Sequence, residues 1–145
     1  MLIGLLEKKD EVLKKEIVKI LCNISSSEDG KRVLFQCNVV AHLNKILHYS
    51  ADSFMTQTAV ACLANIATCI EIKKRLAESG CLIHVLQALQ QGIESSELEL
   101  VKYCLYFIGN MCEDFTEAAY VLGSDNTNNA IYRTTLGNAA NGSFL

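Results

Sequence analysis

The sequence of 145 residues contains no proline and no tryptophan, and only 7% of its residues are aromatic. The absence of proline excludes collagen, polyproline ligands and most turn-rich β architectures. The longest apolar stretches, such as residues 39–43 and 60–66, are far shorter than the roughly 18–20 residues that a membrane-spanning helix needs. We therefore expect no membrane insertion.

Positive charge is also scarce. The 13 Lys and Arg residues against 16 Asp and Glu residues leave a net charge of −3. This charge provides no electrostatic footprint for nucleic acid, so no nucleic-acid partner is expected. Half of the residues are hydrophobic and only 20% are charged, which is the composition of a folded chain rather than a disordered one. The length suits one domain.

The seven cysteines are an odd number and contain no Cys-x-x-Cys motif. Six of them fall in apolar runs typical of helices, and Cys37 falls at a junction between two such runs. Reduced cysteine packs as a small hydrophobe, so we expect core thiols in an intracellular protein, cytoplasmic and/or nuclear. Cys81 and His84 could share a helix face, but two ligands do not make a zinc site. We expect no metal and no cofactor.

The chain repeats itself with a period of 42 residues. Asn23-Ile24 aligns with Asn65-Ile66 at this spacing. The same spacing relates Val18 to Val60, Leu21 to Leu63, Lys31 to Lys73, Leu34 to Leu76, and His42 to His84. A third copy follows at an offset of 45, and we expect its three extra residues in a turn at 91–95.

Every segment within the period has the apolar spacing of a helix, as at Leu82, Val85, Leu86 and Leu89. No stretch alternates with period two for long enough to be a strand. The predicted helices span residues 29–37, 39–49 and 53–68 in one copy, and 71–79, 81–91 and 96–112 in the next. One such unit cannot bury its own apolar faces, so the units are expected to stack into a solenoid.

Residues with special backbone preferences mark the helix ends. Asn38 and Gly80 tolerate the left-handed conformation and are expected to end the short helices. Asp52 or Ser53 is expected to cap the helix that follows. The Ser-Glu-Leu-Glu sequence at 96–99 predicts a capping box at the start of the last long helix.

This pattern resembles the armadillo repeat. The resemblance is carried by the three-helix period and by the long helix ending Ala-Val-Ala-Cys-Leu-Ala-Asn-Ile-Ala at 59–67. Residues 72–86 match that repeat's short helix, glycine and middle helix. The resemblance implies an all-α fold, a right-handed α-solenoid of three-helix repeats, and a non-catalytic protein–protein interaction scaffold. HEAT repeats are the near alternative, but they usually have two helices and often a proline.

The resemblance covers about residues 1–122 and sets the expected domain organisation. We expect an incomplete first repeat at 1–28, repeats at 29–70 and 71–115, the start of a further repeat at 116–122, and a flexible Asn- and Gly-rich tail at 123–145. Met1 aligns inside a middle helix, and neither end supplies a polar capping face. We therefore expect a fragment or truncated form of a longer array.

The resemblance also implies a peptide-binding groove lined by the long helices. The Asn near the end of each long helix binds the ligand backbone in this family, and the matching residues here are Asn23, Asn65 and Asn110. A carboxamide both donates and accepts, so it can pair with a peptide unit. The same amides could instead tie adjacent helix ends together, and both roles stay open.

One turn earlier, nuclear-import receptors of this family carry Trp, whereas this chain has Lys19, Ala61 and Tyr106. The lack of Trp argues against binding of nuclear-localisation signals. Lys19 with Lys15, one turn back, favours an acidic peptide or helix, whereas Tyr103 and Tyr106 make the other end aromatic. Lys15 and Lys19 are alternatively solvated helix-face charges.

Other features favour structural roles. The basic run at 73–75 is typical of the solvated face of a short helix. His42 and His84 are repeat-equivalent, which favours packing over a metal or pH role.

Two alternative functions remain beside the scaffold. The sequence contains no phosphate loop, zinc-protease motif or nucleophile elbow, so we expect no enzyme; a thiol enzyme using Cys81 or Cys62 with a His is the weak alternative. The other is a structural segment that self-associates through its uncapped ends. Its uncovered apolar residues would be Met1, Leu2, Leu5 and Leu6.

Overall fold

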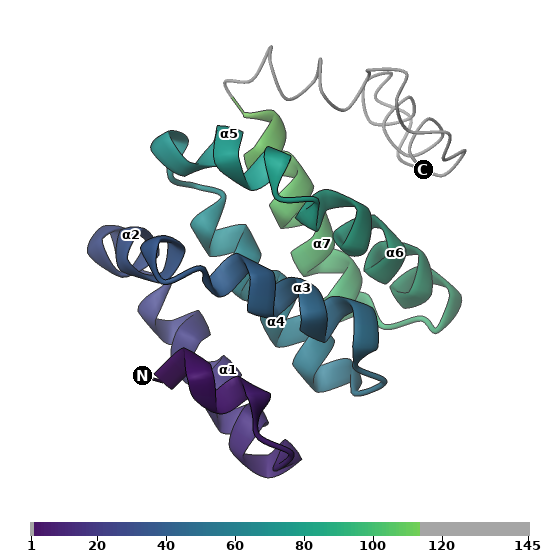
Figure 1. The fold of residues 1–145 in the computed structure, drawn as a ribbon. Coiled ribbons are helices and arrows are strands. Elements are labelled where there is room, and N and C mark those ends of the chain that lie inside the picture. The colour runs from purple at the N-terminus through teal and green to yellow at the C-terminus, as the bar shows by residue number, and fades with distance from the viewer. Residues whose placement is uncertain (1, 114–145) are drawn as a thin grey trace.

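The structure is a computed structural model that describes residues 2–113 (Figure 1). Within these residues it contains helices and no strand. In chain order they are the 3-10 helix η1 (Leu2–Glu7) and the α-helices α1 (Glu11–Ile24), α2 (Glu28–Gln36), α3 (Val39–Tyr49), α4 (Ser53–Ile66), α5 (Ile70–Glu78), α6 (Cys81–Glu94) and α7 (Leu98–Cys112). The helix predicted at 116–122 and the tail at 123–145 lie outside the described residues.

The helices form two stacked layers joined by short connecting helices. The long helices α1, α4 and α7 lie side by side in one layer, and η1, α3 and α6 form the second layer (Figure 1). The short helices α2 and α5 cross at one end of the layers, where each links a long helix to the next middle helix. The same three-helix order is therefore laid down twice, as α2–α3–α4 and α5–α6–α7, and η1 and α1 precede the first of these units.

Side-chain caps set where α1, α2 and α4 begin. Asp52 accepts a hydrogen bond of 2.9 Å from the backbone N–H of Met55, which confirms the expected cap of α4. Asp10 caps α1 in the same way, accepting from Leu13 at 3.0 Å. Ser27 accepts from Gly30 at 3.1 Å and caps α2. Each cap satisfies an amide that has no partner within its helix.

The left-handed residues predicted between the short and middle helices are present. Asn38 has φ 59° and Gly80 has φ 77°, so the chain reverses at equivalent places in both repeats. These are the residue types that adopt this conformation at least cost. Because both turns agree, α3 and α6 take the same direction across their long helices.

The predicted capping box at residues 96–99 is wrong. Ser96 has φ 59° and lies outside the helix, and α7 begins at Leu98 without a side-chain cap. The Glu97 carboxylate instead accepts a hydrogen bond from the Ser53 hydroxyl of α4. The contact with a neighbouring repeat has replaced the local cap.

The three extra residues of the last repeat are also placed differently from the prediction. They lengthen the middle helix, because α6 has 14 residues and α3 has 11. Gly92 is buried in this added turn, and a Cβ there would lie 3.1 Å from Val101 Cγ2 of α7. The glycine lets α6 continue while staying in close contact with α7.

The interpretation of residues 73–75 as a solvated face is wrong for Lys73. Lys73 is only 3% exposed, and its repeat equivalent Lys31 is 6% exposed. The Lys73 ammonium donates to the Glu113 carbonyl oxygen at 2.9 Å, and Lys31 donates to Thr68 Oγ1 at 2.6 Å. Each lysine reaches from the short helix to the end of the long helix in its own repeat, which a local charge pattern does not reveal.

The apolar core runs along the whole array as one cluster, from Ile3 in η1 to Met111 in α7. The central helix α4 packs against α1, α3 and α7, so most of its residues are buried. The apolar edge predicted at the start of the chain is wrong for Leu6, which is buried because η1 packs on α1 and α3. Leu2 is half-buried and Leu5 is exposed, whereas Met1 lies outside the described residues.

Candidate interaction face

The long helices form an exposed surface, which we call the α1–α4–α7 face. It contains a shallow depression of about 290 Å³. The depression is lined by Lys19, Cys22 and Asn23 of α1, by Phe54, Gln57, Thr58 and Ala61 of α4, and by Tyr103 of α7. Three successive long helices thus contribute side chains to one recess.

This depression brings several predicted groove residues together. Lys19, Asn23 and Ala61 lie in it, as expected from their repeat-equivalent positions. Phe54, Gln57 and Thr58 were not predicted. They precede Ala61 by seven, four and three residues, so helical spacing from that position would have found them.

An aromatic pair borders the depression on α7. Tyr103 and Tyr106 contact edge to face, with ring centroids 6.3 Å apart. Lys102 lies over the Tyr103 ring at 4.8 Å and also pairs with Glu99. Tyr106 is exposed although it is large and apolar, and it supplies rigid contact area on this side of the face.

Two of the three predicted asparagines tie neighbouring long helices together. Asn65 Nδ2 donates at 3.0 Å to Oγ of Ser25, the residue that caps the end of α1, and Asn110 Nδ2 donates to the Ala64 carbonyl oxygen of α4 at 2.9 Å. Their side-chain carbonyl oxygens make no hydrogen bond to the described residues. Asn23 is exposed, and within the same part of the chain its side chain has no hydrogen-bond partner. Asn23, which does not link two helices among the described residues, is thus the asparagine that lines the depression.

Both predicted groove lysines form ion pairs. Lys15 Nζ lies 2.6 Å from Asp52 Oδ2, and Lys19 Nζ lies 2.6 Å from Glu16 Oε1. The hydrogen bond from Lys15, together with that from the Met55 amide, lowers the pKa of Asp52. Because Asp52 also caps α4, the ion pair of Lys15 with Asp52 links α1 to the start of α4, which is a structural role. Lys19 belongs to an exposed pair one turn apart on its own helix, which contributes little free energy.

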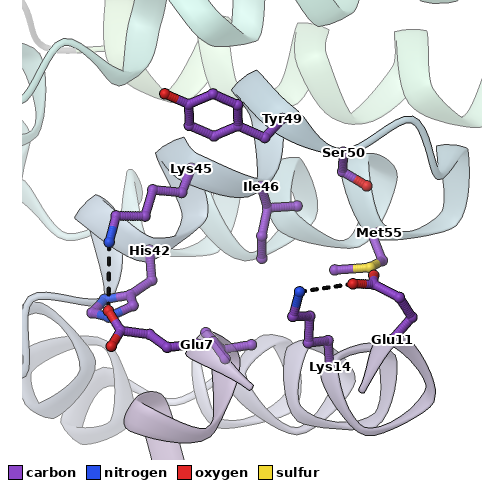
Figure 2. A pocket seen from close by; sticks show the side chains of 10 residues that line it. Glu7, Glu11, Lys14, His42, Lys45, Ile46, Tyr49, Ser50 and Met55 are labelled. Carbon is purple, nitrogen blue, oxygen red and sulfur yellow. Dashed lines mark hydrogen bonds and ion pairs between the residues drawn. The ribbon is translucent and has the colours of Figure 1, made fainter. Parts of the chain in front are cut away.

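A second cavity of about 390 Å³ lies between η1, α1 and α3 (Figure 2). Glu7 points toward Lys45 and His42, at 3.5 Å and 3.6 Å, and Glu11 pairs with Lys14 at 2.7 Å. The charged groups around this cavity are therefore paired with one another. They join η1 to α3 and leave the α1–α4–α7 face as the stronger candidate.

The thiols that the enzyme alternative invoked are buried. Burial raises the pKa of Cys62 to about 12 and that of Cys81 to about 11. Cys81 Sγ also donates to the Leu76 carbonyl oxygen at 3.3 Å. A catalytic thiol needs a lowered pKa and access, so neither cysteine is arranged as a nucleophile.

Among residues 2–113, no group of three or more His, Cys, Asp or Glu side chains could hold a metal ion. None of the helices described is long and apolar enough to cross a membrane.

The arrangement of the helices is shared with solved structures of designed proteins. A designed armadillo repeat protein superposes with a TM-score of 0.68 and 23% identity, over 83% of this chain and 53% of its own. The fold is an armadillo-type solenoid. Another designed armadillo repeat protein, solved in complex with the peptide (KR)4, has a TM-score of 0.69 and 25% identity, over 97% of this chain and 62% of its own.

An engineered protein with 20% identity has a TM-score of 0.68, over 86% of this chain and 55% of its own. This chain thus spans less than two thirds of the length of each of these three solved structures. No family model and no curated protein matches the sequence. The armadillo resemblance found in the residues is therefore confirmed at the level of the fold, and α1, α4 and α7 are its long third helices.

Proposed function

We propose that this armadillo-type array is a non-catalytic protein-interaction scaffold that binds an extended peptide or a helix along the α1–α4–α7 face. The observation that carries the proposal is the depression shared by the three long helices. One of the structurally similar proteins was solved in complex with a peptide. That complex is a property of the designed protein, and it supports the proposal by analogy. The seven cysteines are all free, which fits an intracellular location, cytoplasmic and/or nuclear.

The chemistry of the face suits a peptide ligand. Phe54 and Tyr103 offer aromatic surface in the depression, and the exposed Tyr106 extends this surface along α7. Aromatic side chains provide large contact area with little conformational freedom to lose. The exposed Asn23 amide has a donor and an acceptor available for a peptide unit. Within residues 2–113 the side-chain carbonyl oxygens of Asn65 and Asn110 have no hydrogen-bond partner, so they can serve as further acceptors.

The ligand proposed for the α1 end carries acidic side chains near Lys15 and Lys19. Lys19 provides this preference most directly, because it lines the depression and its partner Glu16 is one turn away in solvent. An acidic ligand would replace that weak pair at little cost. Lys15 contributes long-range attraction while it holds Asp52.

Peptide-library selection on the full chain, followed by affinity measurement, tests this site. Asn23→Ala and Tyr106→Ala are each expected to weaken selected peptides by about tenfold, which corresponds to about 1.4 kcal/mol. Val12→Ala is the matched control, because Val12 is an exposed residue of α1 that does not line the depression. Neither test residue is buried, so thermal unfolding should not change.

Peptides whose affinity is indifferent to both substitutions would move the binding site away from this face. For the charge preference, Lys19→Glu should weaken acidic peptides and spare neutral ones, with a smaller difference at high salt. Equal effects on acidic and neutral peptides would contradict the acidic preference alone.

A further inference from the structure

A third cavity, of about 860 Å³, lies where α2, α3 and α5 meet, at the end of the array where the short helices cross (Figure 1). We call it the α2–α3–α5 cavity. Its walls include Phe35 and Gln36 at the end of α2, Asn44 on α3, and Arg75 and Glu78 near the end of α5. None of these residues lines the depression on the α1–α4–α7 face. The volume is enough to hold a small ligand or a short stretch of peptide.

Helix α3 departs from the repeat at two positions that line this cavity. Ala41 and Asn44 are followed 42 residues later, in α6, by Ile83 and Leu86. Leu86 is only 2% exposed, and Ile83 packs against the core. The smaller alanine leaves space, and the asparagine places a carboxamide where the repeat has an apolar side chain. A local departure that costs stability is typical of a functional position.

The hydrogen bonds of Asn44 are incomplete. Its Nδ2 donates at 3.3 Å to the carbonyl oxygen of Ser79, the residue that ends α5. Its Oδ1 is buried and has no hydrogen-bond partner within residues 2–113. An unpaired buried oxygen is unfavourable for folding, which indicates a role for the asparagine other than stability. Because an amide nitrogen carries two hydrogens, Nδ2 keeps one of them for an acceptor in the cavity.

Arg75 supplies a cation that is oriented but not neutralised. Its guanidinium lies over the Phe35 ring, 4.9 Å from the ring centroid, which holds it beside the cavity. Within the described part of the chain Arg75 makes no ion pair, whereas Arg32 on α2 pairs with Asp29 and Glu71. A guanidinium can donate two parallel hydrogen bonds to a carboxylate, so a carboxylate is the group that this site fits best.

The exposed lining residues limit what can carry that carboxylate. Gln36, Glu78 and Ser79 are exposed, so a ligand in the cavity stays partly in solvent, whereas a small-molecule pocket encloses most of its ligand. An open site of this kind suits a segment of protein whose ends continue outside it. Glu78 repels a ligand with many negative charges, such as a nucleic acid, which favours a single carboxylate beside Arg75.

We propose that the α2–α3–α5 cavity binds a peptide segment of a partner protein that carries a carboxylate. Arg75 pairs with this carboxylate, and Asn44 Nδ2 donates to an oxygen of the same segment. Gln36 adds an exposed amide that can pair with the peptide backbone. Because the cavity shares no residue with the depression on the α1–α4–α7 face, one array can hold two protein segments at once.

Selection of displayed random peptides on the full chain, followed by affinity measurement against variants, tests the proposal. Peptides that use this cavity should lose about tenfold or more in affinity with Arg75→Gln, which removes a charged hydrogen-bond donor. Lys74→Gln is the matched control, because it makes the same charge change at a neighbouring exposed residue that does not line the cavity. The same peptides should be unaffected by Tyr106→Ala on the α1–α4–α7 face.

Asn44→Leu gives a second test, since it introduces the residue that α6 has at this position. It should abolish binding of these peptides and raise the melting temperature by a few degrees, because leucine fills the space and removes the unpaired oxygen. These opposite effects separate a binding role from a structural one. If Asn44→Leu lowered the melting temperature and left peptide affinity unchanged, Asn44 would be a structural residue beside solvent, and the proposal would be wrong.

The source of the carboxylate is identified with an Arg75-dependent peptide. Its acidic side chains are changed one at a time to their amides, and its C-terminus is amidated in a separate peptide. The change that removes binding identifies the group that Arg75 holds, and a peptide that tolerates all of them would contradict the carboxylate assignment. A selection that yields no Arg75-dependent peptide would overturn this binding site, whereas peptides sensitive to Tyr106→Ala would still support the scaffold function of the α1–α4–α7 face.

Discussion

Lys31 and Lys73 hold a charged group inside the array because each can reach the end of a long helix. The last carbonyl groups of a helix lack partners within it and lie at its negative end. Lys73 meets the Glu113 carbonyl oxygen there, and Lys31 meets the Thr68 hydroxyl and the Glu28 carboxylate. The aliphatic stems pack along the short helix while the ammonium groups stay hydrogen-bonded.

Lys73→Ala is therefore expected to lower the free energy of unfolding by about 1–3 kcal/mol, since it removes a charged hydrogen bond from a buried site. Urea unfolding followed by circular dichroism measures this change. Lys74→Ala is the control, because Lys74 is an exposed neighbour on the same helix and should change stability by less than about 0.5 kcal/mol. Equal effects of the two substitutions would contradict the structural role of Lys73.

Gly30 and Gly109 both lie in helices, but only at Gly30 does the surrounding structure leave no space for a Cβ atom. Gly30 lies in the first turn of α2, where a Cβ would be 1.9 Å from the Ile24 carbonyl oxygen. That oxygen belongs to the last turn of α1, so the glycine permits the tight passage from α1 to α2. Gly109 lies inside α7, and a Cβ there meets nothing within 4 Å.

Gly30→Ala is expected to destabilise the protein by about 2 kcal/mol or more, because backbone must move to admit the methyl group. Gly109→Ala is expected to stabilise it by about 0.5–1 kcal/mol, since alanine is the better helix former. Thermal and urea unfolding of the two variants side by side measures both. If both substitutions stabilised the protein, the close contact between α1 and α2 would be wrong.

Across the whole array, the buried thiols link stability to pH. Burial raises the pKa of Cys62 and of Cys104 to about 12 from an ordinary value of 9.0. Above pH 9 the unfolded chain releases these protons while the folded chain keeps them. The unfolded state then binds fewer protons, so the free energy of unfolding falls as pH rises from about 9 toward 12.

Cys62→Ala should make this decline shallower by up to about 1.4 kcal/mol per pH unit, although the variant starts from a lower stability. Urea titrations at pH 8, 9, 10 and 10.5 under reducing conditions measure the slope. Wild-type and variant curves that stay parallel over this range would show that the Cys62 pKa is not raised.

The repeat and its elements were predictable because they depend on local rules. Helical apolar spacing predicted residues 39–49, and the structure has α3 there. Asn38 and Gly80 adopt the left-handed turns expected of them, and Asp52 is the expected cap. These features need only the chain within a few residues.

The candidate site was predictable in part. Lys19, Asn23 and Ala61 line one recess, since repeats that stack put equivalent positions side by side, but their role in binding stays a prediction. Repeat equivalence did not show that Asn65 is tied to Ser25 or that Lys15 is paired with Asp52. Those partners are about 40 residues away, and only packing between helices brings them within hydrogen-bond distance.

By itself, the sequence determined the helices, their period and the fold they stack into, because each helix must bury an apolar face of known spacing. Only the tertiary structure decided which side each neighbour covers. It buried Lys73, left Ser96 outside a helix, and exposed Ile20 where Cys62 and Phe107 are enclosed. The physical reason is that an apolar side chain favours burial under any neighbour of suitable shape. Its presence in the sequence therefore does not identify the neighbour that covers it.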